Sequence, residues 1–208
     1  MRVLVADDHA IVRRGTRELI AERYPDAEFV EAGTGEAAVA MADGRFDLVV
    51  IDLGMPGRGG LDAVRELACR HPRMPIVVLS QHDEAEYAAR ALRAGAGGYV
   101  TKDSATDELV SAVESTLRGR KFVSAALAAD LVGAVADESS RPAHSTLSTR
   151  ELEVLKRIGR GMSLKEIGAE LAISDKTAGT YRRRILEKLS LSSTADLIRY
   201  AIHAKLSD

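Results

Sequence analysis

The sequence is poor in aromatic residues and in cysteine, and each shortage excludes a class of protein. Aromatic residues make up 4% of the 208 residues and tryptophan is absent, which argues against a platform that stacks the bases of single-stranded nucleic acid. Cys69 is the only cysteine, so a disulfide framework and a zinc site built from cysteines are excluded. No apolar run reaches the length of a membrane span, and the first residues are typical of a strand rather than a signal peptide. We therefore expect a cytoplasmic protein without a membrane partner.

The net charge of −2 conceals an uneven distribution along the chain. Residues 1–120 contain 15 basic and 20 acidic residues, a net −5, and residues 121–144 contain 2 and 3, a net −1. Residues 145–208 contain 12 basic and 8 acidic residues, a net +4. This asymmetry makes nucleic acid a candidate partner for the basic end. Ordinary variation between solvated surfaces explains it equally well from charge alone.

Short apolar runs alternate with amphipathic stretches of helix length in the first part of the chain. The strand-like runs are 2–6, 27–31, 47–52, 75–80 and 97–101, and the helix-like stretches are 10–22, 34–42, 60–70, 84–94 and 105–118. Alternation of this kind predicts an α/β fold, with a five-stranded parallel sheet and right-handed crossovers. The run at 48–51 is apolar throughout, which is typical of a strand covered by helices on both faces.

The pattern changes near residue 120. Residues 121–136 are typical of one more helix, and the polar stretch 137–144 with its proline is the best candidate for a linker. Beyond it the periodicity is helical only, with four helices, a capping box at Ser148 and Glu151, and an N-cap at Ser174. We therefore predict a first domain over 1–120, a helical linker over 121–144 and an all-α domain over 145–208.

Polar side chains that can carry chemistry follow four of the predicted strands. They are Asp7, Asp8, Asp52, Ser80 and Lys102, at the sheet edge where open α/β folds bind ligands. Three carboxylates in one crevice repel one another unless protons or a cation intervene, and hard oxygen ligands suit Mg²⁺. A carboxylate beside Mg²⁺ can attack a phosphoryl group and form an acyl phosphate, with the ammonium and the hydroxyl stabilising the charge. Each residue alone is more often a turn former, a cap or a solvated charge, so the prediction depends on their conjunction.

Four motifs in this order resemble the receiver domain of two-component response regulators. They are Asp7-Asp8-His9, Asp52-Leu53-Gly54-Met55-Pro56 with Gly60, Ser80, and Tyr99-Val100-Thr101-Lys102. The resemblance implies a flavodoxin-like (CheY-like) fold over about residues 1–120. It also implies that a histidine kinase transfers a phosphoryl group to Asp52.

The resemblance further implies roles for the residues around Asp52. Mg²⁺ would be bound directly by Asp8, Asp52 and the Gly54 carbonyl, and through water by Asp7. Lys102 would neutralise charge, Ser80 would move toward the phosphoryl group, and Tyr99 would swing inward behind it. Gly54 and His82 would flank the path of a hydrolytic water, where His82 orients that water or only caps a helix.

The basic end of the chain contains two predicted helices joined by a short turn, one marked by Ile167 and Leu171 and one over Lys176–Ser190. On the second helix, Lys176, Thr180, Arg183 and Glu187 share an outward face. This arrangement is typical of a helix-turn-helix, whose second helix can enter a major groove. A helix with a solvated basic face is the simpler interpretation from charge alone.

Residues 145–206 resemble the LuxR/GerE-type DNA-binding domain of the NarL/FixJ group of response regulators. The resemblance implies that the groove is contacted by Gly179, Thr180 and Arg183. It makes Lys165, Lys176, Arg184 and Lys188 candidates for contacts to the DNA backbone. It implies that the last helix, around 194–204, dimerises through Leu197, Tyr200 and Ala201.

Four positions, Leu164, Ala178, Gly179 and Tyr181, depart from the usual pattern of this family. Leu164 stands where the family usually has asparagine, and Gly179 stands where a cationic side chain is usual. Gly179 also costs about 1 kcal/mol of helix stability relative to alanine. Tyr181 either contacts a phosphate or packs in the core.

We expect a transcription factor that is controlled by phosphorylation, dimerises when phosphorylated and binds promoter DNA. The receiver would act chemically only on itself, so we expect no separate enzymatic activity. One alternative is a signalling protein whose C-terminal helices bind a protein instead of DNA. A weaker alternative is a dedicated phosphotransfer or phosphatase enzyme.

Overall fold

The computed structural model describes residues 1–55, 59–82, 85–124, 127–128, 143–204 and 206. The chain divides into two compact units, Met1–Glu138 (the first unit) and Ser139–Asp208 (the second unit). Most of the helix expected over 121–136, and most of the expected linker, lies outside the described residues. Among the helices that are described, none has the length and apolar character needed to cross a membrane.

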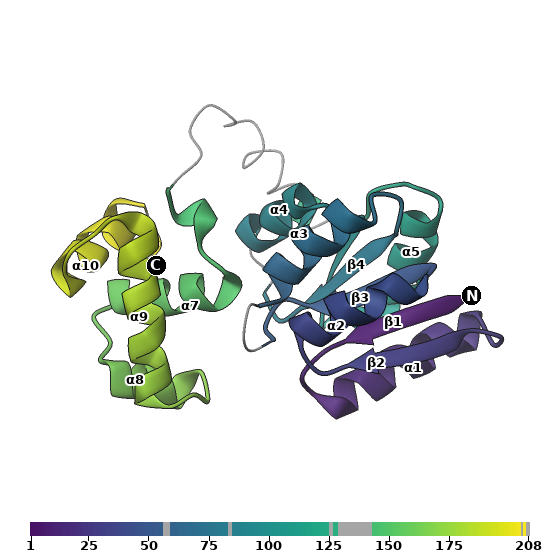
Figure 1. The fold of residues 1–208 in the computed structure, drawn as a ribbon, viewed down its shortest axis with the longest axis horizontal. Coiled ribbons are helices and arrows are strands. Elements are labelled where there is room, and N and C mark those ends of the chain that lie inside the picture. Colours follow the sequence, from purple (N-terminus) through teal and green to yellow (C-terminus); the bar gives the residue numbers. More distant parts are fainter. Residues whose placement is uncertain (56–58, 83–84, 125–126, 129–142, 205, 207–208) are drawn as a thin grey trace. The chain divides into compact units, whose positions relative to one another are not determined.

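The first unit is a five-stranded sheet with helices on both sides (Figure 1). Its strands are β1 (Arg2–Ala6), β2 (Glu28–Ala32), β3 (Leu48–Asp52), β4 (Ile76–Ser80) and β5 (Gly98–Thr101), and its helices are α1 (Ala10–Arg23), α2 (Gly35–Met41), α3 (Gly60–Arg70), α4 (Ala85–Ala94) and α5 (Ala105–Leu117), with a 3₁₀ turn, η1 (Ala42–Gly44). Every strand pair is parallel, in the order β2-β1-β3-β4-β5. The predicted α/β class and parallel sheet are confirmed.

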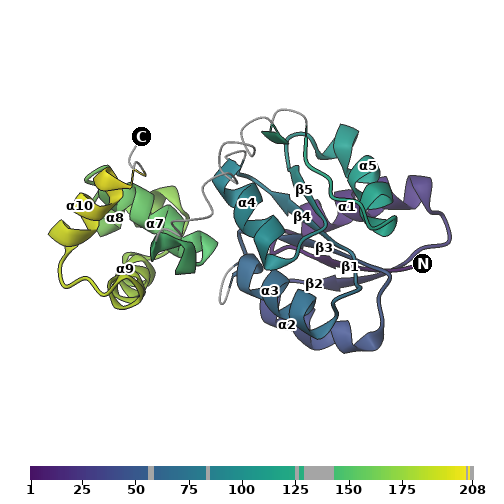
Figure 2. The same cartoon turned by 90° about the horizontal axis from the view of Figure 1, so that it is seen from above.

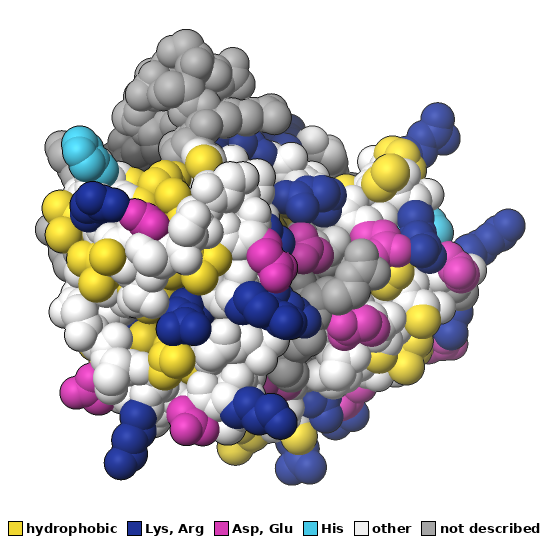
Figure 3. All heavy atoms as spheres, turned by 60° about the vertical axis from the view of Figure 1, so that its left-hand side comes forward, with side chains coloured by type: hydrophobic (Ala, Val, Ile, Leu, Met, Phe, Trp, Pro, Cys, Tyr) yellow, Lys and Arg dark blue, Asp and Glu magenta, His cyan; other side chains and the backbone are white. Residues whose placement is uncertain are grey.

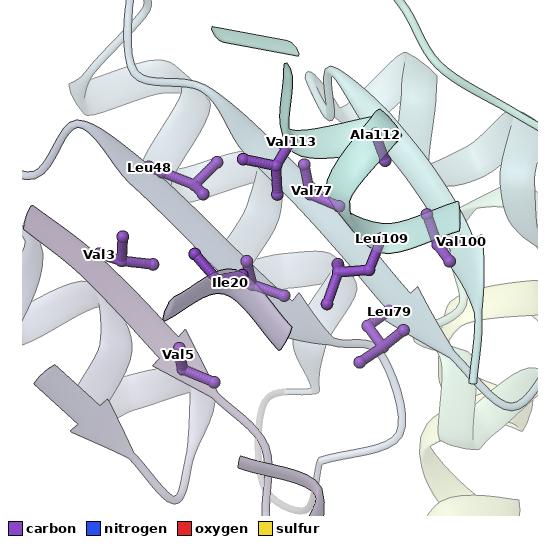
Figure 4. Close-up of a cluster of buried hydrophobic side chains, with 11 residues drawn as sticks. Val3, Val5, Ile20, Leu48, Val77, Leu79, Val100, Leu109, Ala112 and Val113 are labelled. Atoms are coloured by element: carbon purple, nitrogen blue, oxygen red, sulfur yellow. The ribbon is translucent and has the colours of Figure 1, made fainter. Parts of the chain in front are cut away.

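Helices cover both faces of this sheet. α1 and α5 pack together on one face, while α2, α3 and α4 form a continuous layer on the other (Figure 2). Beneath α1 and α5 lies a cluster of buried apolar side chains, among them Val50, Val77 and Leu109 (Figure 4). All residues of β3 and β4 are buried, as expected for central strands covered on both faces.

The strand order brings the carboxyl ends of four neighbouring strands to one edge. β1, β3, β4 and β5 lie side by side, so the polar residues that follow them converge. The start of α3 lies close against the end of β3, and this approach needs a glycine. A Cβ atom at Gly60 would lie 1.9 Å from the Asp52 carbonyl oxygen, so no larger residue fits without moving the backbone.

The first unit continues past the residue at which the linker is predicted to begin. Phe122 forms a parallel bridge with Gly98: its N–H donates to the Gly97 carbonyl, and its carbonyl accepts from the Tyr99 N–H. The Lys121 ammonium donates to the Ala96 carbonyl. The free edge of β5 offers unpaired backbone groups, which residues 121–122 satisfy.

The described residues of the second unit form helices and no strand. These are the 3₁₀ turn η2 (Ala143–Thr146) and the helices α7 (Thr149–Gly159), α8 (Leu164–Glu170), α9 (Asp175–Leu189) and α10 (Thr194–His203). α7 packs on α9 and α10, and α8 packs on α9. The capping box of Ser148 and Glu151 and the N-cap at Ser174 are confirmed.

Candidate functional site

The carboxyl edge of the sheet holds two buried carboxylates with a shared ammonium group. Asp7, which follows β1, and Asp52, which ends β3, are 3% and 4% exposed. Lys102, which follows β5, places its Nζ 2.7 Å from Asp7 Oδ2 and 3.2 Å from Asp52 Oδ2. The structure therefore brings together three residues that lie far apart in the sequence.

These groups perturb each other's ionisation. Burial raises the pKa of Asp52, and the neighbouring Asp7 charge raises it further; Lys102 and a hydrogen bond from the Gly54 N–H act in the opposite direction without reversing the shift. Burial lowers the pKa of Lys102, but the charges of Asp52 and Asp7 outweigh it and raise that pKa above its ordinary value. Lys102 is thus held as a cation beside the carboxylates.

The acidic loop after β1 has donor atoms suited to a cation. Oxygen and nitrogen atoms of Asp7, Asp8 and His9 lie within 4.8 Å of one another. Asp8 Oδ1 is shielded from solvent and, among the described residues, accepts no hydrogen bond of regular geometry, although the His9 ring nitrogen lies 2.8 Å away. A buried carboxylate oxygen in this state fits a hard divalent cation. Asp52 is not part of this group of atoms within the described residues; its Oδ2 lies 3.2 Å from Lys102 Nζ.

Gly54 keeps a side chain away from Asp52. A Cβ atom at Gly54 would lie 3.2 Å from Asp52 Oδ2, so glycine spares that carboxylate a close contact. The side chain of Ser80, at the end of β4, is fully buried. Its Oγ accepts a hydrogen bond of 3.2 Å from the His82 N–H.

Tyr99 and His82 are linked behind the site. The ring of Tyr99 is fully buried, and its hydroxyl donates to the His82 carbonyl over 2.6 Å. The His82 ring stacks on Tyr87 at 4.0 Å between centroids, an arrangement that sequence reasoning did not consider. Tyr99 lies inward in this structure.

Arg13 of α1 is a residue that sequence reasoning overlooked. Its guanidinium donates to the Asp7 carbonyl over 2.7 Å and to Glu31 Oε2 over 2.9 Å. It therefore ties the acidic loop to α1 and β2. The sequence offers no signal for this role, because a basic residue in an amphipathic helix is usually solvated.

In the second unit, α8 and α9 form the predicted helix-turn-helix. The turn between them requires a close backbone approach at Gly168, where a Cβ atom would lie 2.8 Å from the Ile173 carbonyl oxygen. Ala172 in this turn has a positive φ of 54°. Ser163 and Ser174 cap the two helices by accepting from the N–H groups of Glu166 and Thr177.

The candidate DNA-binding residues differ in exposure. The exposed ones are Lys165, Lys176, Arg183, Arg184 and Lys188, while Gly179 and Thr180 are half-buried. Lys188 already has a partner, because its Nζ lies 2.6 Å from Oε2 of the buried Glu151. Tyr181 is buried in the core, and burial, the main influence, raises its pKa. Figure 3 shows acidic and basic side chains interspersed on the face that it presents.

The predicted dimerisation residues are corrected by the structure. Leu197 and Ala201 are fully buried, because this stripe packs α10 against α7. The Tyr200 hydroxyl is also used within the unit: it lies 2.9 Å from His144 Nδ1 and accepts from the His144 N–H at 3.0 Å. Leu197 and Ala201 therefore cannot form the surface of a dimer while the helix keeps this packing.

Comparison with known families identifies both units. Residues 3–114 match the response regulator receiver domain, and residues 145–201 match the luxR family of bacterial regulatory proteins.

Relatives match along the whole chain. The oxygen regulatory protein NreC of Staphylococcus carnosus is 35% identical, with 100% of each chain covered. The response regulator UvrY of Escherichia coli K12 is 33% identical over 97% of this chain and 94% of its own. Among solved structures, RcsB of Salmonella enterica serovar Typhimurium, bound to a promoter in the presence of the phosphomimetic BeF₃⁻, is 26% identical over 96% of this chain and 97% of its own, with a TM-score of 0.60.

Proposed function

Since the chain belongs to the response regulators that join a receiver domain to a LuxR-family DNA-binding domain, we propose that phosphorylation of Asp52 by a histidine kinase controls its binding to promoter DNA. The observation that carries this proposal is the pair of buried carboxylates, Asp7 and Asp52, with Lys102 Nζ within 3.2 Å of both. We place this regulator in the cytoplasm, where its DNA target is. The receiver acts on itself only, so no separate enzymatic activity is proposed.

The transfer step follows from the chemistry of Asp52. A carboxylate oxygen attacks the phosphorus of the kinase phosphohistidine, the P–N bond breaks, and the leaving imidazole keeps the electron pair and takes up a proton. Lys102 Nζ, held as a cation 3.2 Å from Asp52 Oδ2, stabilises the charge of the phosphoryl oxygens. Glycine at position 54 spares Asp52 Oδ2 a side-chain contact, which would favour entry of the phosphoryl group.

A divalent cation completes this site in the proposal. Mg²⁺ supplies, when bound, the positive charge that neutralises the phosphoryl oxygens during transfer. Asp8, Asp52 and the Gly54 carbonyl would hold it, and Asp7 would hold it through water. The shielded Asp8 Oδ1, without a regular hydrogen bond, supports this assignment. Asp52 would then exchange part of its contact with Lys102 for the cation.

The phosphoryl group is sensed by Ser80 and Tyr99 in this proposal. Ser80 Oγ is within reach of a hydrogen bond from the His82 N–H, and the Tyr99 hydroxyl is bonded to the His82 carbonyl. Movement of Ser80 toward the phosphoryl group would disturb both contacts. Tyr99 is also bonded through its N–H to the Phe122 carbonyl, so the change reaches the start of the segment that leaves the first unit.

The second unit would read DNA with α9. Lys165, Lys176 and Arg184 are exposed and reach the phosphates, while Thr180 and Arg183 face the bases. A phosphorylation-induced homodimer would match a two-fold promoter site. The DNA-bound RcsB structure supports DNA over a protein as the partner of these helices.

One experiment tests both halves of the proposal. The full chain is incubated with Mg²⁺ and a small phosphodonor, and its intact mass and light scattering are measured together with a promoter-fragment shift. We expect one added phosphoryl group, dimerisation and stronger, salt-dependent DNA binding, all absent in Asp52→Ala. An Asp52→Ala variant that still gains the phosphoryl group would refute the assignment of Asp52.

A further inference from the structure

Gly179 is a glycine that the fold of the second unit does not require. It is the fifth of the 15 residues of α9, in the interior of the helix. A Cβ atom at this position would meet only Leu164 Cδ1, at 3.7 Å, which is an ordinary contact. At Gly168, by contrast, a Cβ atom would collide with backbone at 2.8 Å. Alanine would therefore fit at Gly179 and would favour the helix.

The missing side chain leaves open space above the backbone of α9 beside Leu164, which we call the hollow. Leu164, the first residue of α8, is half-buried and lies beside it. The Thr180 hydroxyl donates to the Lys176 carbonyl over 3.1 Å, so its hydrogen is used within the helix and its methyl group remains for contact. The side chain that an added Cβ atom would meet here, Leu164, is apolar.

Three exposed basic side chains belong to the helices that carry Gly179 and Leu164, and the acidic Glu187 lies 3.9 Å from one of them, Arg183. Lys165, Lys176 and Arg183 are exposed, and Lys176, Thr180 and Arg183 share one face of α9. Cations at this spacing hold DNA phosphates on either side of an inserted helix. The cations would hold DNA against α9, and the side chain beside Gly179 is apolar. The part of the DNA that suits this place is therefore an apolar group on the edge of a base.

We propose that the hollow formed by Gly179, Leu164 and Thr180 recognises the methyl group of a thymine in the major groove. The C5-methyl of thymine is the one apolar group that a base pair presents there. This inference rests on the proposed binding of DNA by the second unit and names a specificity determinant within it. Glycine at 179 lets the helix backbone come close, and Leu164 supplies the contact surface.

The test removes thymine methyl groups one at a time. Phosphodonor-treated full-length protein first selects its preferred duplex from a random library at fixed salt. Each thymine of that duplex is then replaced by deoxyuridine, which lacks only the methyl group, and the dissociation constant is measured. We expect wild type to lose about fourfold in affinity at one thymine of each half-site, the factor given by one buried methyl-sized group.

Two variants tie this effect to the hollow. Gly179→Ala fills it, and Leu164→Ala removes its wall, so in both the penalty for deoxyuridine at that thymine should fall below twofold. Gly15→Ala is the matched control: Gly15 also lies inside a long helix, α1, and has no heavy atom within 4 Å of an added Cβ atom. It should keep the full penalty.

The outcomes separate this inference from the proposed function. If wild type selects no duplex, the proposed DNA binding fails, and the inference fails with it. If wild type binds a selected duplex but no deoxyuridine penalty depends on Gly179 and Leu164, only the inference is overturned. Gly179→Ala should also raise the thermal midpoint of the second unit by about 4–8 °C; a lower midpoint would show that the fold needs this glycine and would likewise overturn it.

Discussion

Lys188 is a candidate DNA contact to which the structure gives a partner inside the fold. Its Nζ lies 2.6 Å from Oε2 of Glu151, which is 2% exposed. We expect Lys188→Met to destabilise the second unit, because methionine keeps much of the apolar stem but removes the charge that compensates the buried carboxylate. We expect the same variant to have little effect on DNA affinity.

The size of the stability loss follows from the exposure of the two partners. Removing one partner from a fully buried ion pair costs about 3–5 kcal/mol. The side chain of Lys188 is 38% exposed, and Glu151 Oε2 also accepts from the Ser148 N–H at 2.7 Å. Solvent screening and this remaining bond reduce the expected loss to about 1–2 kcal/mol. For a unit of this size, each kcal/mol lowers the thermal midpoint by about 4–8 °C.

Two measurements decide the role of Lys188. Thermal unfolding of the full chain gives the stability of the second unit, and DNA affinity at several salt concentrations gives the number of phosphate contacts. The matched control is Lys176→Met, which should leave the midpoint unchanged and reduce the salt slope by about 0.9 for each lost phosphate contact. A Lys188→Met variant with an unchanged midpoint and a reduced slope would refute this reasoning.

Four further predictions concern both units. Burial raises the pKa of Asp52, so the folded protein binds the proton of Asp52 more tightly than the unfolded chain does. The resulting stabilisation of the fold is complete below the ordinary pKa of 3.8 and is lost as pH rises through the raised pKa. Asp52→Asn should therefore unfold at a higher temperature than wild type at pH 7, and the gain should vanish toward pH 3; a constant gain would contradict the assignment. Mg²⁺ at ten times its dissociation constant should stabilise wild type by about 1.4 kcal/mol and Asp8→Asn far less, as calorimetry would show. Arg13→Ala should slow labelling by a small phosphodonor and destabilise the first unit by about 1–3 kcal/mol, whereas equal effects from Arg14→Ala would deny Arg13 a special role. Arg183→Ala should weaken operator binding by about 1–3 kcal/mol, and an unchanged dissociation constant at fixed salt would exclude its contact with a base.

The fold and the strand-end residues were predictable because their signals repeat along the chain. Each apolar run lies within one residue of an observed strand. The signal is clearest for β3 and β4, because burial on both faces demands continuous apolar sequence. Parallel strands place their carboxyl ends at one edge, so Asp7, Asp52 and Lys102 could be grouped before any distance was known. What could not be predicted is that Lys102 contacts both Asp7 and Asp52, while Asp52 does not belong to the group of donor atoms from Asp7, Asp8 and His9 among the described residues.

The dimerisation residues were mispredicted for a physical reason. Periodicity identified Leu197 and Ala201 as an apolar stripe, but a stripe can face its own domain or a second copy of the chain. Only the packing of α10 on α7 shows that it faces the domain. Lys188 is a similar case, because Glu151 is 37 residues earlier in the sequence and no local pattern joins them.

The basic character of the second unit is concentrated by its ion pairs. Arg157 with Glu170 and Lys188 with Glu151 place opposite charges within 3 Å, so each pair contributes little to the field felt at the distance of an approaching duplex. The ion pairs do not change the net charge of the second unit. The field around the unit therefore comes mainly from basic side chains that have no ion-pair partner. Among the described residues, Lys165, Lys176 and Arg184 are exposed and form no ion pair. They lie on α8 and α9, the two helices of the helix-turn-helix, so the electrostatic attraction acts on the same surface that carries Gly179 and Arg183.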